Sequence, residues 1–502
     1  MSHRGPDEHD FEVYNNNIIC HERLSIIDLH TGKQPIQGTD TGYVVHNGEI
    51  YNHQALRDGE LSGHTFRTTC DSEVIVHMYE KYGSDFCNRL KGVFAFIVMD
   101  KDNFIVARDP IGIKPLYWGK DSDGALYFSS EMKAIEDQVI QMEAFPPGHY
   151  YTREEGFVKY YNPAYQDYTV CNKELDLAKL RDGLIESTRR RLMSDVPLGV
   201  LLSGGLDSSL TSSIAKRLLG DKELHSFSIG LDENSPDVQA ATKVAEFLGT
   251  KHHNVFFTVE QGIEIIDKLI WHLETYDVTS IRASTPMYFL SKFIHDMGIK
   301  VVLSGEGADE IFGGYLYFHN SPSLEEFQKE TIRRVGLLST SDCLRADKST
   351  MAWSLEARVP FLDRDFLDIA MEIDPKFKDP KLNQGIEKWI LRKAFDDPNN
   401  PWLPKEVLWR QKEQFSDGVG YNWIDELMAY CAQQVSDEDF AEASALYPHN
   451  TPDTKEAFYM RRIFHKHYPS DDAAKTVLKW IPKWQENKDP SGRANKVHEK
   501  AI

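Results

Sequence analysis

The sequence lacks the cysteine patterns of a disulfide-rich or zinc-binding protein. Its six cysteines are scattered over 502 residues, and no two of them form a Cys-x-x-Cys pair. Disulfide frameworks and structural zinc sites both depend on closely spaced cysteines. We therefore expect a protein of a reducing compartment, the cytoplasm.

Long apolar runs are missing as well. The longest, 93–99, is far shorter than the ~20 residues that a membrane helix needs. The charged N-terminal sequence has no apolar stretch of the kind found in a signal peptide. We expect no membrane partner.

Positive charge is scarce: 57 lysines and arginines stand against 78 acidic residues, which gives a net charge of −21. Such a chain repels nucleic acid and anionic lipid, so we expect no nucleic-acid partner, and an anionic ligand needs a local binding device. The apolar content of 41% excludes a disordered chain. At about 150 residues per domain, the length predicts two to four domains.

The pattern changes near residue 170. Up to about residue 160, short strands and turn signals predict antiparallel sheet with flanking helices. From residue 174, apolar runs alternate with helical segments, which is typical of a parallel α/β sheet. The polar stretch 162–173 is the predicted linker. The strands and helices expected are 41–51, 94–100, 103–108, 125–129, 148–152, 198–202, 225–231, 252–257 and 299–303 as strands, and 71–82, 174–193, 210–219 and 237–248 as helices.

A glycine-rich loop, Ser203-Gly204-Gly205-Leu206-Asp207-Ser208, joins a predicted strand to a predicted helix. Ligands of open α/β sheets bind where strands end, and glycines followed by a helix N-terminus suit a phosphate. The loop has neither a Walker A nor a GxGxxG pattern. The carboxylate of Asp207 suits a phosphate only with Mg²⁺ between them. The plain alternative is a strand-to-helix turn capped by serine and aspartate.

A second loop rich in glycine and acid, 304–310, follows the predicted strand 299–303. We expect Asp309 to share a Mg²⁺ with Asp207, and Glu306 to orient a nucleophile or accept its proton. The alternative is a solvated acidic turn. The presence of two such loops in one half of the chain makes this alternative less favoured.

Both loops resemble those of the N-type ATP pyrophosphatases, and further segments narrow the resemblance to the glutamine-hydrolysing asparagine synthetases. The resemblance covers essentially the whole chain. The segments that carry it are 203–208, 274–284, 304–307, 351–363, 410–418 and 489–493.

This resemblance implies an ATP-pyrophosphatase α/β domain over 174–502. It implies that aspartate attacks the α-phosphate of ATP, giving β-aspartyl-adenylate and pyrophosphate, and that ammonia then displaces AMP to give asparagine. The implied ATP site consists of Leu201, Ser203, Gly204, Gly205, Asp207, Ser208, Ile229, Ser304 and Gly305, with Asp207 and Asp309 as Mg²⁺ ligands.

The same resemblance implies four catalytic residues. Lys412 neutralises charge on the departing phosphates, and Glu306 takes a proton from ammonia. Thr279 and Arg282 hold aspartate, Arg282 through a two-point carboxylate pairing. For Lys412 and Arg282, surface ion pairing is the plain alternative.

For residues 1–161 the resemblance implies a truncated αββα glutaminase-like domain of the Ntn type. Arg23 is implied to pair with the α-carboxylate of glutamine and Asp71 with its α-amine, while Asn47 and Gly48 form the oxyanion hole. Taken singly, each is a polar residue of a turn or an edge strand. The full implied site is Arg23, Leu24, Ser25, Ile26, Ile27, Asn47, Gly48, Glu49 and Asp71.

The sequence departs from the family at its start. Family members begin with a strand that carries a nucleophilic cysteine, whose own α-amine serves as base, whereas this sequence begins at Met1-Ser2-His3-Arg4. We therefore expect the chain as written to make asparagine from free ammonia and not from glutamine.

Two other functions stay open. A β-lactam synthetase has the same two halves with a different substrate pocket, and a non-catalytic nucleotide- or glutamine-binding partner of full-length subunits would keep the fold without the reaction. The resemblance also implies a possible homodimer.

Overall fold

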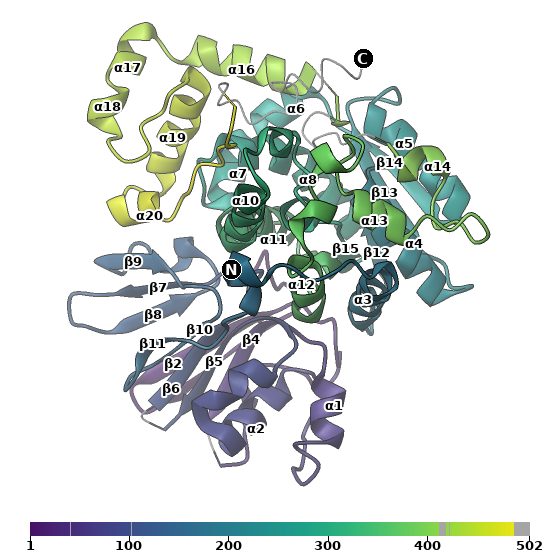
Figure 1. The fold of residues 1–502 in the computed structure, drawn as a ribbon. Coiled ribbons are helices and arrows are strands. Elements are labelled where there is room, and N and C mark those ends of the chain that lie inside the picture. The colour runs from purple at the N-terminus through teal and green to yellow at the C-terminus, as the bar shows by residue number, and fades with distance from the viewer. Residues whose placement is uncertain (41, 102, 411–417, 421, 486–502) are drawn as a thin grey trace.

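The computed structural model describes the chain except for residues 41, 102, 411–417, 421 and 486–502. Figure 1 shows the N-terminal half, in purple and blue, below the C-terminal half. Lys412 and the segment 489–493 lie outside the described residues.

Antiparallel sheets build the described N-terminal half: a hairpin of β1 and β2, a six-stranded sheet of order β11-β10-β6-β5-β4-β3, and a three-stranded sheet of order β8-β7-β9. The strands are β1 (Glu8–Tyr14), β2 (Asn17–Arg23), β3 (Ile36–Gln37), β4 (Tyr43–Ile50), β5 (Gly92–Asp100), β6 (Asn103–Arg108), β7 (Tyr117–Lys120), β8 (Leu126–Ser129), β9 (Gln141–Ala144), β10 (His149–Thr152) and β11 (Gly156–Lys159).

The alternation of side chains along β5 explains how these layers stack. Phe94 and Phe96 point to the face covered by α1 (His53–Asp58) and α2 (Glu73–Tyr82), where they join one buried cluster. Ala95 points to the opposite face and joins the cluster beneath the three-stranded sheet. The central strand β5 is thus buried on both faces.

A five-stranded parallel sheet of order β14-β13-β12-β15-β16 organises the described C-terminal half. The chain runs outward from β12 to β14 on one side and returns to β15 on the other, so the strand order reverses between β12 and β15. Ligands of such sheets bind at this switch point, outside the carboxyl ends of the strands. The strands are β12 (Leu198–Leu201), β13 (His225–Gly230), β14 (Lys251–Phe256), β15 (Val301–Leu303) and β16 (Glu356–Arg358).

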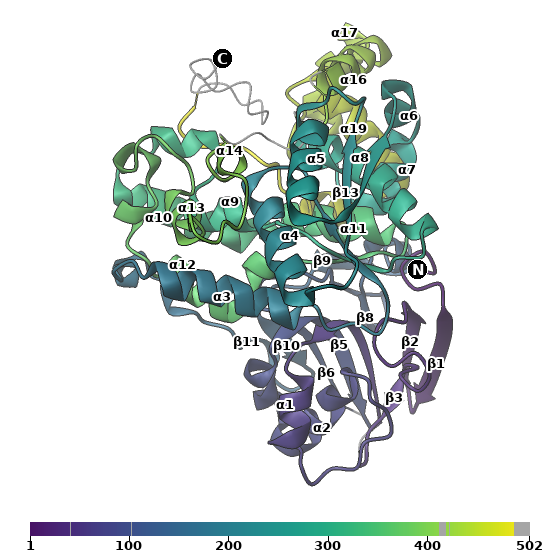
Figure 2. The same ribbon diagram turned by 90° about the vertical axis from the view of Figure 1, so that its right-hand side faces the viewer.

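Helices cover both faces of the parallel sheet, and Figure 2 shows α5 and α8 flanking β13. On one face α4 and α5 pack through Leu210 and Val244, and on the other α8 packs through Ile281 and Tyr288. The helices of this half are α3 (Leu177–Arg190), α4 (Leu206–Leu219), α5 (Pro236–Leu248), α6 (Val259–Glu264), α7 (Ile266–Leu273), α8 (Val278–Asp296), α9 (Ala308–Phe312), α10 (Leu324–Leu337), α11 (Asp342–Met351), α12 (Arg364–Met371), α13 (Trp389–Ala394), α14 (Lys405–Leu408), α16 (Asn422–Gln434), α17 (Asp437–Ala441), α18 (Ala443–Leu446), α19 (Lys455–His467) and α20 (Asp471–Lys475).

The predicted linker 162–173 is not a loose connection. It contains short 3₁₀ turns at Ala164–Gln166 and Tyr168–Val170. Tyr165 and Cys171 are both buried in the core of the C-terminal half. Most residues of 162–173 are polar and exposed, which is why the sequence predicted a linker there. The side chains of Tyr165 and Cys171 nevertheless fix the segment to the core.

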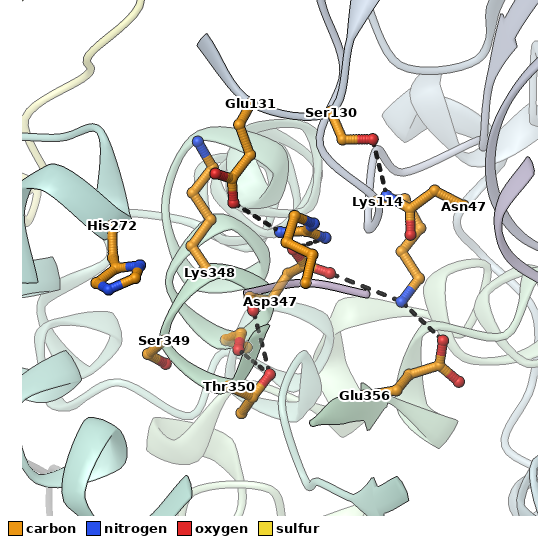
Figure 3. Close-up of polar contacts among 12 residues, drawn as sticks. Asn47, Lys114, Ser130, Glu131, His272, Asp347, Lys348, Ser349, Thr350 and Glu356 are labelled. Carbon is orange, nitrogen blue, oxygen red and sulfur yellow. Dashed lines mark hydrogen bonds and ion pairs between the residues drawn. The ribbon is translucent and has the colours of Figure 1, made fainter. Parts of the chain in front are cut away.

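Buried ion pairs join the two halves, as Figure 3 shows. Lys114 Nζ lies 3.0 Å from Glu356 Oε2 and 3.6 Å from Asp347 Oδ1. Arg4 pairs with Asp347 at 2.7 Å and with Glu131 at 3.1 Å. Burying such charges is costly unless each has partners, so the network fixes how the halves face each other.

No helix in the described residues combines the length and apolar character that crossing a membrane requires.

Candidate functional site

A cavity lies at the switch point of the parallel sheet, at the carboxyl ends of β12, β13 and β15. The two loops rich in glycine and acid both line it. Of the residues predicted from the sequence for the C-terminal half, the cavity brings together Leu201, Ser203, Gly205, Asp207, Ser208, Ile229, Thr279, Ser304, Gly305, Glu306 and Asp309.

Glycines allow the two loops to approach each other closely. A Cβ on Gly305 would lie 2.6 Å from the backbone nitrogen of Ser208, so the loops meet backbone to backbone. Gly204 has φ +73°, and a Cβ there would lie 2.4 Å from the side chain of Ala240 on α5. Gly204 does not line the cavity; it allows α5 to pack against the turn.

The first loop leads into α4, whose N-terminal amides face the loop. The hydroxyls of Ser203 and Ser208 lie 3.0 Å apart, and both side chains line the cavity. A helix N-terminus flanked by hydroxyl donors is a site for an anion such as phosphate.

Asp207 and Asp309 converge on one cation, the ammonium of Lys388. Lys388 Nζ lies 2.7 Å from Asp309 Oδ1 and also pairs with Asp207 Oδ2. Gly314 leaves room for this contact, because a Cβ there would lie 2.1 Å from Lys388 Cε. The two loops therefore place their carboxylates around a single positive charge.

This pair of carboxylates fits a Mg²⁺ ion. Mg²⁺ is usually held by one or two carboxylates together with substrate phosphates and waters. Within the described residues no group of three or more metal-ligating side chains is present, so phosphates and waters would supply the remaining ligands.

A second charged cluster lines the cavity at the start of α11. Arg345 Nη2 lies 2.8 Å from Glu306 Oε1 and 3.3 Å from Asp342 Oδ1. Burial raises the pKa of Glu306, although Arg345 opposes the shift. Burial, together with Asp342 and Asp309, raises the pKa of the neighbouring Glu310 to about 8.

Arg282 is not among the residues that line the cavity. Its guanidinium is buried in a two-point pairing with Glu456, in which Nε donates to Oε1 at 2.9 Å and Nη2 to Oε2 at 2.5 Å. Thr279, one turn earlier on α8, does line the cavity. Its Oγ1 is buried and has no hydrogen-bond partner in the described part of the chain.

The residues predicted to bind glutamine lie on and around β4 and the segment after β2. Arg23 pairs with Glu8 at 2.5 Å and donates to the carbonyl of Asp28 at 2.6 Å. Gly48 has φ +139°, and a Cβ there would lie 1.9 Å from the carbonyl oxygen of Val93, so glycine is required. The stretch Leu24, Ser25, Ile26 and Ile27 then runs toward the C-terminal half, where the carbonyl of Ile26 accepts a hydrogen bond from Asp195 at 3.1 Å.

The remaining predicted side chains of this group are already engaged. Asn47 Nδ2 donates to Ser130 Oγ at 3.1 Å, and Glu49 lies 2.8 Å from Arg358. Asp71 Oδ2 accepts the backbone N–H of Ile50 at 2.7 Å, which holds this carboxylate beside the end of β4.

We expect Asp71→Asn to stabilise the fold at alkaline pH. Burial raises the pKa of Asp71 from 3.8 to about 6. The ionised carboxylate therefore costs folding free energy above pH 6 and costs none below pH 3.8. With 1.36 kcal/mol per pKa unit, the variant gains about 3 kcal/mol at pH 8 and about half of that at pH 5. Urea unfolding at the two pH values measures both gains.

Asparagine keeps an acceptor for the N–H of Ile50, so the substitution removes charge and little else. Asp58→Asn on the exposed end of α1 is the matched control and leaves stability unchanged. A variant less stable than the native chain at pH 8 would show that the ionised form of Asp71 is the favoured one.

Lys388, Arg345 and Asp342 are site residues that the sequence did not reveal. Lys388 stands at the start of α13 and Asp342 and Arg345 on α11, far along the chain from either glycine-rich loop. No local pattern marks them, because they follow no strand end, and only the packing of α11 and α13 brings them to the cavity. Arg410, at the edge of a motif quoted above, also lines it.

The fold defines a class of protein in which an antiparallel glutaminase-like domain is joined to a parallel α/β domain. In this chain a glycine-rich loop without a Walker A pattern lies at the switch point of the parallel sheet. The family model for asparagine synthase matches residues 179–330 and 320–487, and the model for the glutamine amidotransferase domain matches residues 1–161. The chain belongs to the asparagine synthase family.

Curated plant proteins are similar over nearly the whole chain. The glutamine-hydrolyzing asparagine synthetase of Asparagus officinalis is 50% identical over 98% of this chain and 88% of its own length. The root asparagine synthetase of Pisum sativum and asparagine synthetase 1 of Arabidopsis thaliana are each 50% identical over 98% of this chain and 89% of their own length. Since the amidotransferase match spans residues 1–161, the expected loss of an N-terminal segment stays a prediction.

Proposed function

We propose that the protein synthesises L-asparagine from L-aspartate in an ATP-dependent reaction that releases AMP and pyrophosphate, with glutamine or ammonia as the nitrogen source. The reaction needs one cavity that holds a triphosphate and a carboxylic acid together. One observation carries the proposal: the loops after β12 and β15 face a single cavity, in which Asp207 and Asp309 share the ammonium of Lys388.

The triphosphate occupies the part of the cavity built by the first loop. The backbone around Gly205, the hydroxyls of Ser203 and Ser208 and the N-terminus of α4 bind pyrophosphate. Leu201 and Ile229 contact the nucleoside, and Ser304 and Gly305 contact the nucleotide from the second loop. Lys388 is positioned to neutralise negative charge that develops on the leaving pyrophosphate. The same role predicted for Lys412 stays a prediction.

Asp207 and Asp309 would hold Mg²⁺. When bound, the ion supplies charge neutralisation between the carboxylates and the phosphates. The two carboxylates themselves keep the loops at a fixed separation, and Lys388 balances their charge.

Glu306 is proposed to remove a proton from ammonia as it attacks the acyl-adenylate. Its raised pKa favours proton uptake, because a buried carboxylate gains most from becoming neutral. Thr279 donates its hydroxyl to aspartate. Arg282 serves to fix α8 through Glu456, which departs from the direct contact that the sequence predicted.

In the proposed glutamine site Arg23 and Asp71 bind the two ends of the amino acid and Asn47 and Gly48 form the oxyanion hole. Glu49 and the segment 24–27 line it. We propose the domains as 1–161 and 174–502. The six free cysteines support a cytoplasmic location. The homodimer stays a prediction.

The test is isotope exchange between pyrophosphate and ATP. With the full chain and Mg²⁺ we expect exchange only when L-aspartate is present, and asparagine, AMP and pyrophosphate in equal amounts when ammonium is added. Running the assay with glutamine in place of ammonium identifies the donor. No exchange would indicate a non-catalytic binding partner, and nucleotide consumption without asparagine would indicate a β-lactam synthetase-like enzyme.

A further inference from the structure

One turn of α11 presents a cation and an acid to the cavity. Asp342 and Arg345 stand three residues apart on this helix, and both side chains line the cavity. They are separate from the Lys388 group, because Arg345 contacts Glu306 and Asp342 while Lys388 contacts Asp207 and Asp309. The cavity thus contains a second charged cluster, whose members differ from those of the Lys388 group.

The guanidinium of Arg345 has an unused donor. The side chain is buried, and Nη2 is engaged by both Glu306 and Asp342. Nη1 is also buried, yet within the described residues it has no hydrogen-bond partner. An unmade hydrogen bond from a buried charged group is costly, so the arrangement calls for an acceptor that the described residues do not supply.

The other cations that line the cavity have partners in the protein. Lys388 pairs with Asp207 and Asp309, and Arg410 lies 3.8 Å from Asp237 and donates to the carbonyl of Gly204 at 3.5 Å. Arg392 donates to the carbonyls of Glu387 and Leu408 at 2.8 and 2.6 Å. Arg282 is held by Glu456 and does not line the cavity. Arg345 is therefore the arginine, among the described residues, that the structure leaves able to receive a carboxylate at this end of the site.

Asp342 complements this donor. Its Oδ1 lies 3.3 Å from Arg345, and its side chain is partly exposed to the cavity. A carboxylate next to a guanidinium with a spare N–H matches the two charges of an α-amino acid, whose carboxylate and ammonium lie on one carbon. The hydroxyl of Thr279, which is likewise buried and has no hydrogen-bond partner among the residues that the structure describes, adds a further polar group to the same cavity.

We propose that Arg345 and Asp342 form the subsite that recognises the α-carboxylate and the α-ammonium of the amino-acid substrate. This inference rests on the proposed function and names the residues that select an α-amino acid. With the α-carbon held at α11, the side-chain carboxylate of aspartate is left to face the nucleotide. Selection then depends on both charges, and an acid that lacks either one loses one contact.

The experiment crosses two variants with two substrate analogues. β-Alanine is aspartate without the α-carboxylate, and succinate is aspartate without the α-amine. In the pyrophosphate exchange assay, we expect Arg345→Met to raise the KM for L-aspartate by about 10- to 100-fold, the cost of a charge-assisted hydrogen bond. The KM for β-alanine is higher than that for L-aspartate in the native chain. In Arg345→Met it stays within about twofold of the native value, because β-alanine has no group for Arg345 to bind.

Asp342→Asn gives the reciprocal result: the KM for L-aspartate rises and the KM for succinate does not. Arg345→Lys keeps the charge without the planar fork and gives an intermediate value. The KM for ATP is unchanged in all three variants. Arg333→Met, which removes a partly exposed arginine on α10 that pairs with Glu330, is the matched control and behaves as the native chain.

Equal losses for L-aspartate, β-alanine and succinate would overturn the inference, because they would show that Arg345 acts by holding Glu306 in place. An unchanged KM for L-aspartate in either variant would overturn it as well. Should Arg345→Met fail to fold, as judged by thermal unfolding, the comparison of Asp342→Asn on L-aspartate and succinate decides. Failure of the proposed function is distinct, since the native chain would then show no aspartate-dependent exchange.

Discussion

Lys388→Met lowers the rate of aspartate-dependent pyrophosphate exchange by about 10³-fold at saturating ATP. The ammonium of Lys388 lies between Asp207 and Asp309 in the cavity, and a fixed charge at a site of developing negative charge contributes about 10²- to 10³-fold to the rate. The variant also leaves the two carboxylates without their shared lysine. Both effects leave less positive charge beside the departing pyrophosphate, so they act in the same direction on the rate at saturating ATP.

The matched control is Lys393→Met, five residues further along the same helix, where the lysine is exposed and pairs with Asp396 at 3.6 Å. It keeps the native rate. Lys388→Arg keeps the charge and recovers part of the activity. A faster exchange in Lys388→Met at low Mg²⁺ would contradict the prediction, because it would mean that the ammonium only competes with the ion for the two aspartates.

The parts of the site that follow strand ends were predictable from the sequence. An apolar strand followed by glycines and acids is a local pattern, and parallel strands bring such loops to the same edge of a sheet. Ser203, Asp207, Glu306 and Asp309 were found in this way, and all four line the cavity. The elements around them were predicted to within a few residues: helix 237–248, for instance, is Pro236–Leu248.

What the sequence could not supply is how remote helices pair their charges. Arg282 and Arg345 are both arginines on helices near the site, and nothing in their neighbours separates them. The structure ties Arg282 to Glu456, 174 residues away, and leaves Arg345 at the cavity. Such pairings depend on the relative placement of α8, α11 and α19, which arises from packing and not from any local pattern.

The antiparallel half shows the same limit. The predicted strand 103–108 is observed as Asn103–Arg108, because a short apolar run that is buried on both faces marks a strand in the interior of a sheet. The hairpin of β1 and β2 was not predicted, since its exposed face carries Phe11, Val13 and Ile18 and the apolar pattern does not mark an inner side.

Arg358→Met lowers the free energy of unfolding by about 3–5 kcal/mol, the usual cost of leaving buried charges without their partner. Arg358 is fully buried at the end of β16 and lies 2.8 Å from Glu49 and 2.9 Å from Glu356. Its carbonyl accepts the N–H of Ser304 at 2.8 Å. Arg358 therefore joins the segment predicted to bind glutamine, through its side chain, to the strand edge that carries the cavity, through its backbone. Urea unfolding at pH 7.5 measures the loss.

The dependence on pH separates electrostatics from packing. Burial raises the pKa of Glu356, but Lys114 and Arg358 overcome this and lower it from 4.5 to about 2. The stabilisation from its ionised form is thus complete above pH 4.5 and disappears as the pH falls toward 2. The loss in Arg358→Met therefore shrinks on acidification through this range, whereas a cavity left by the missing side chain would cost the same at every pH. Arg364→Met, which removes a partly exposed arginine on α12, is the control. Burial raises the pKa of Glu49 even with Arg358 beside it, so the ionised form of Glu49 is costly once Arg358 is removed, and Glu49→Gln added to Arg358→Met restores part of the stability. A loss that is independent of pH, with no restoration in the double variant, would mean that Arg358 joins the two halves of the chain by packing alone.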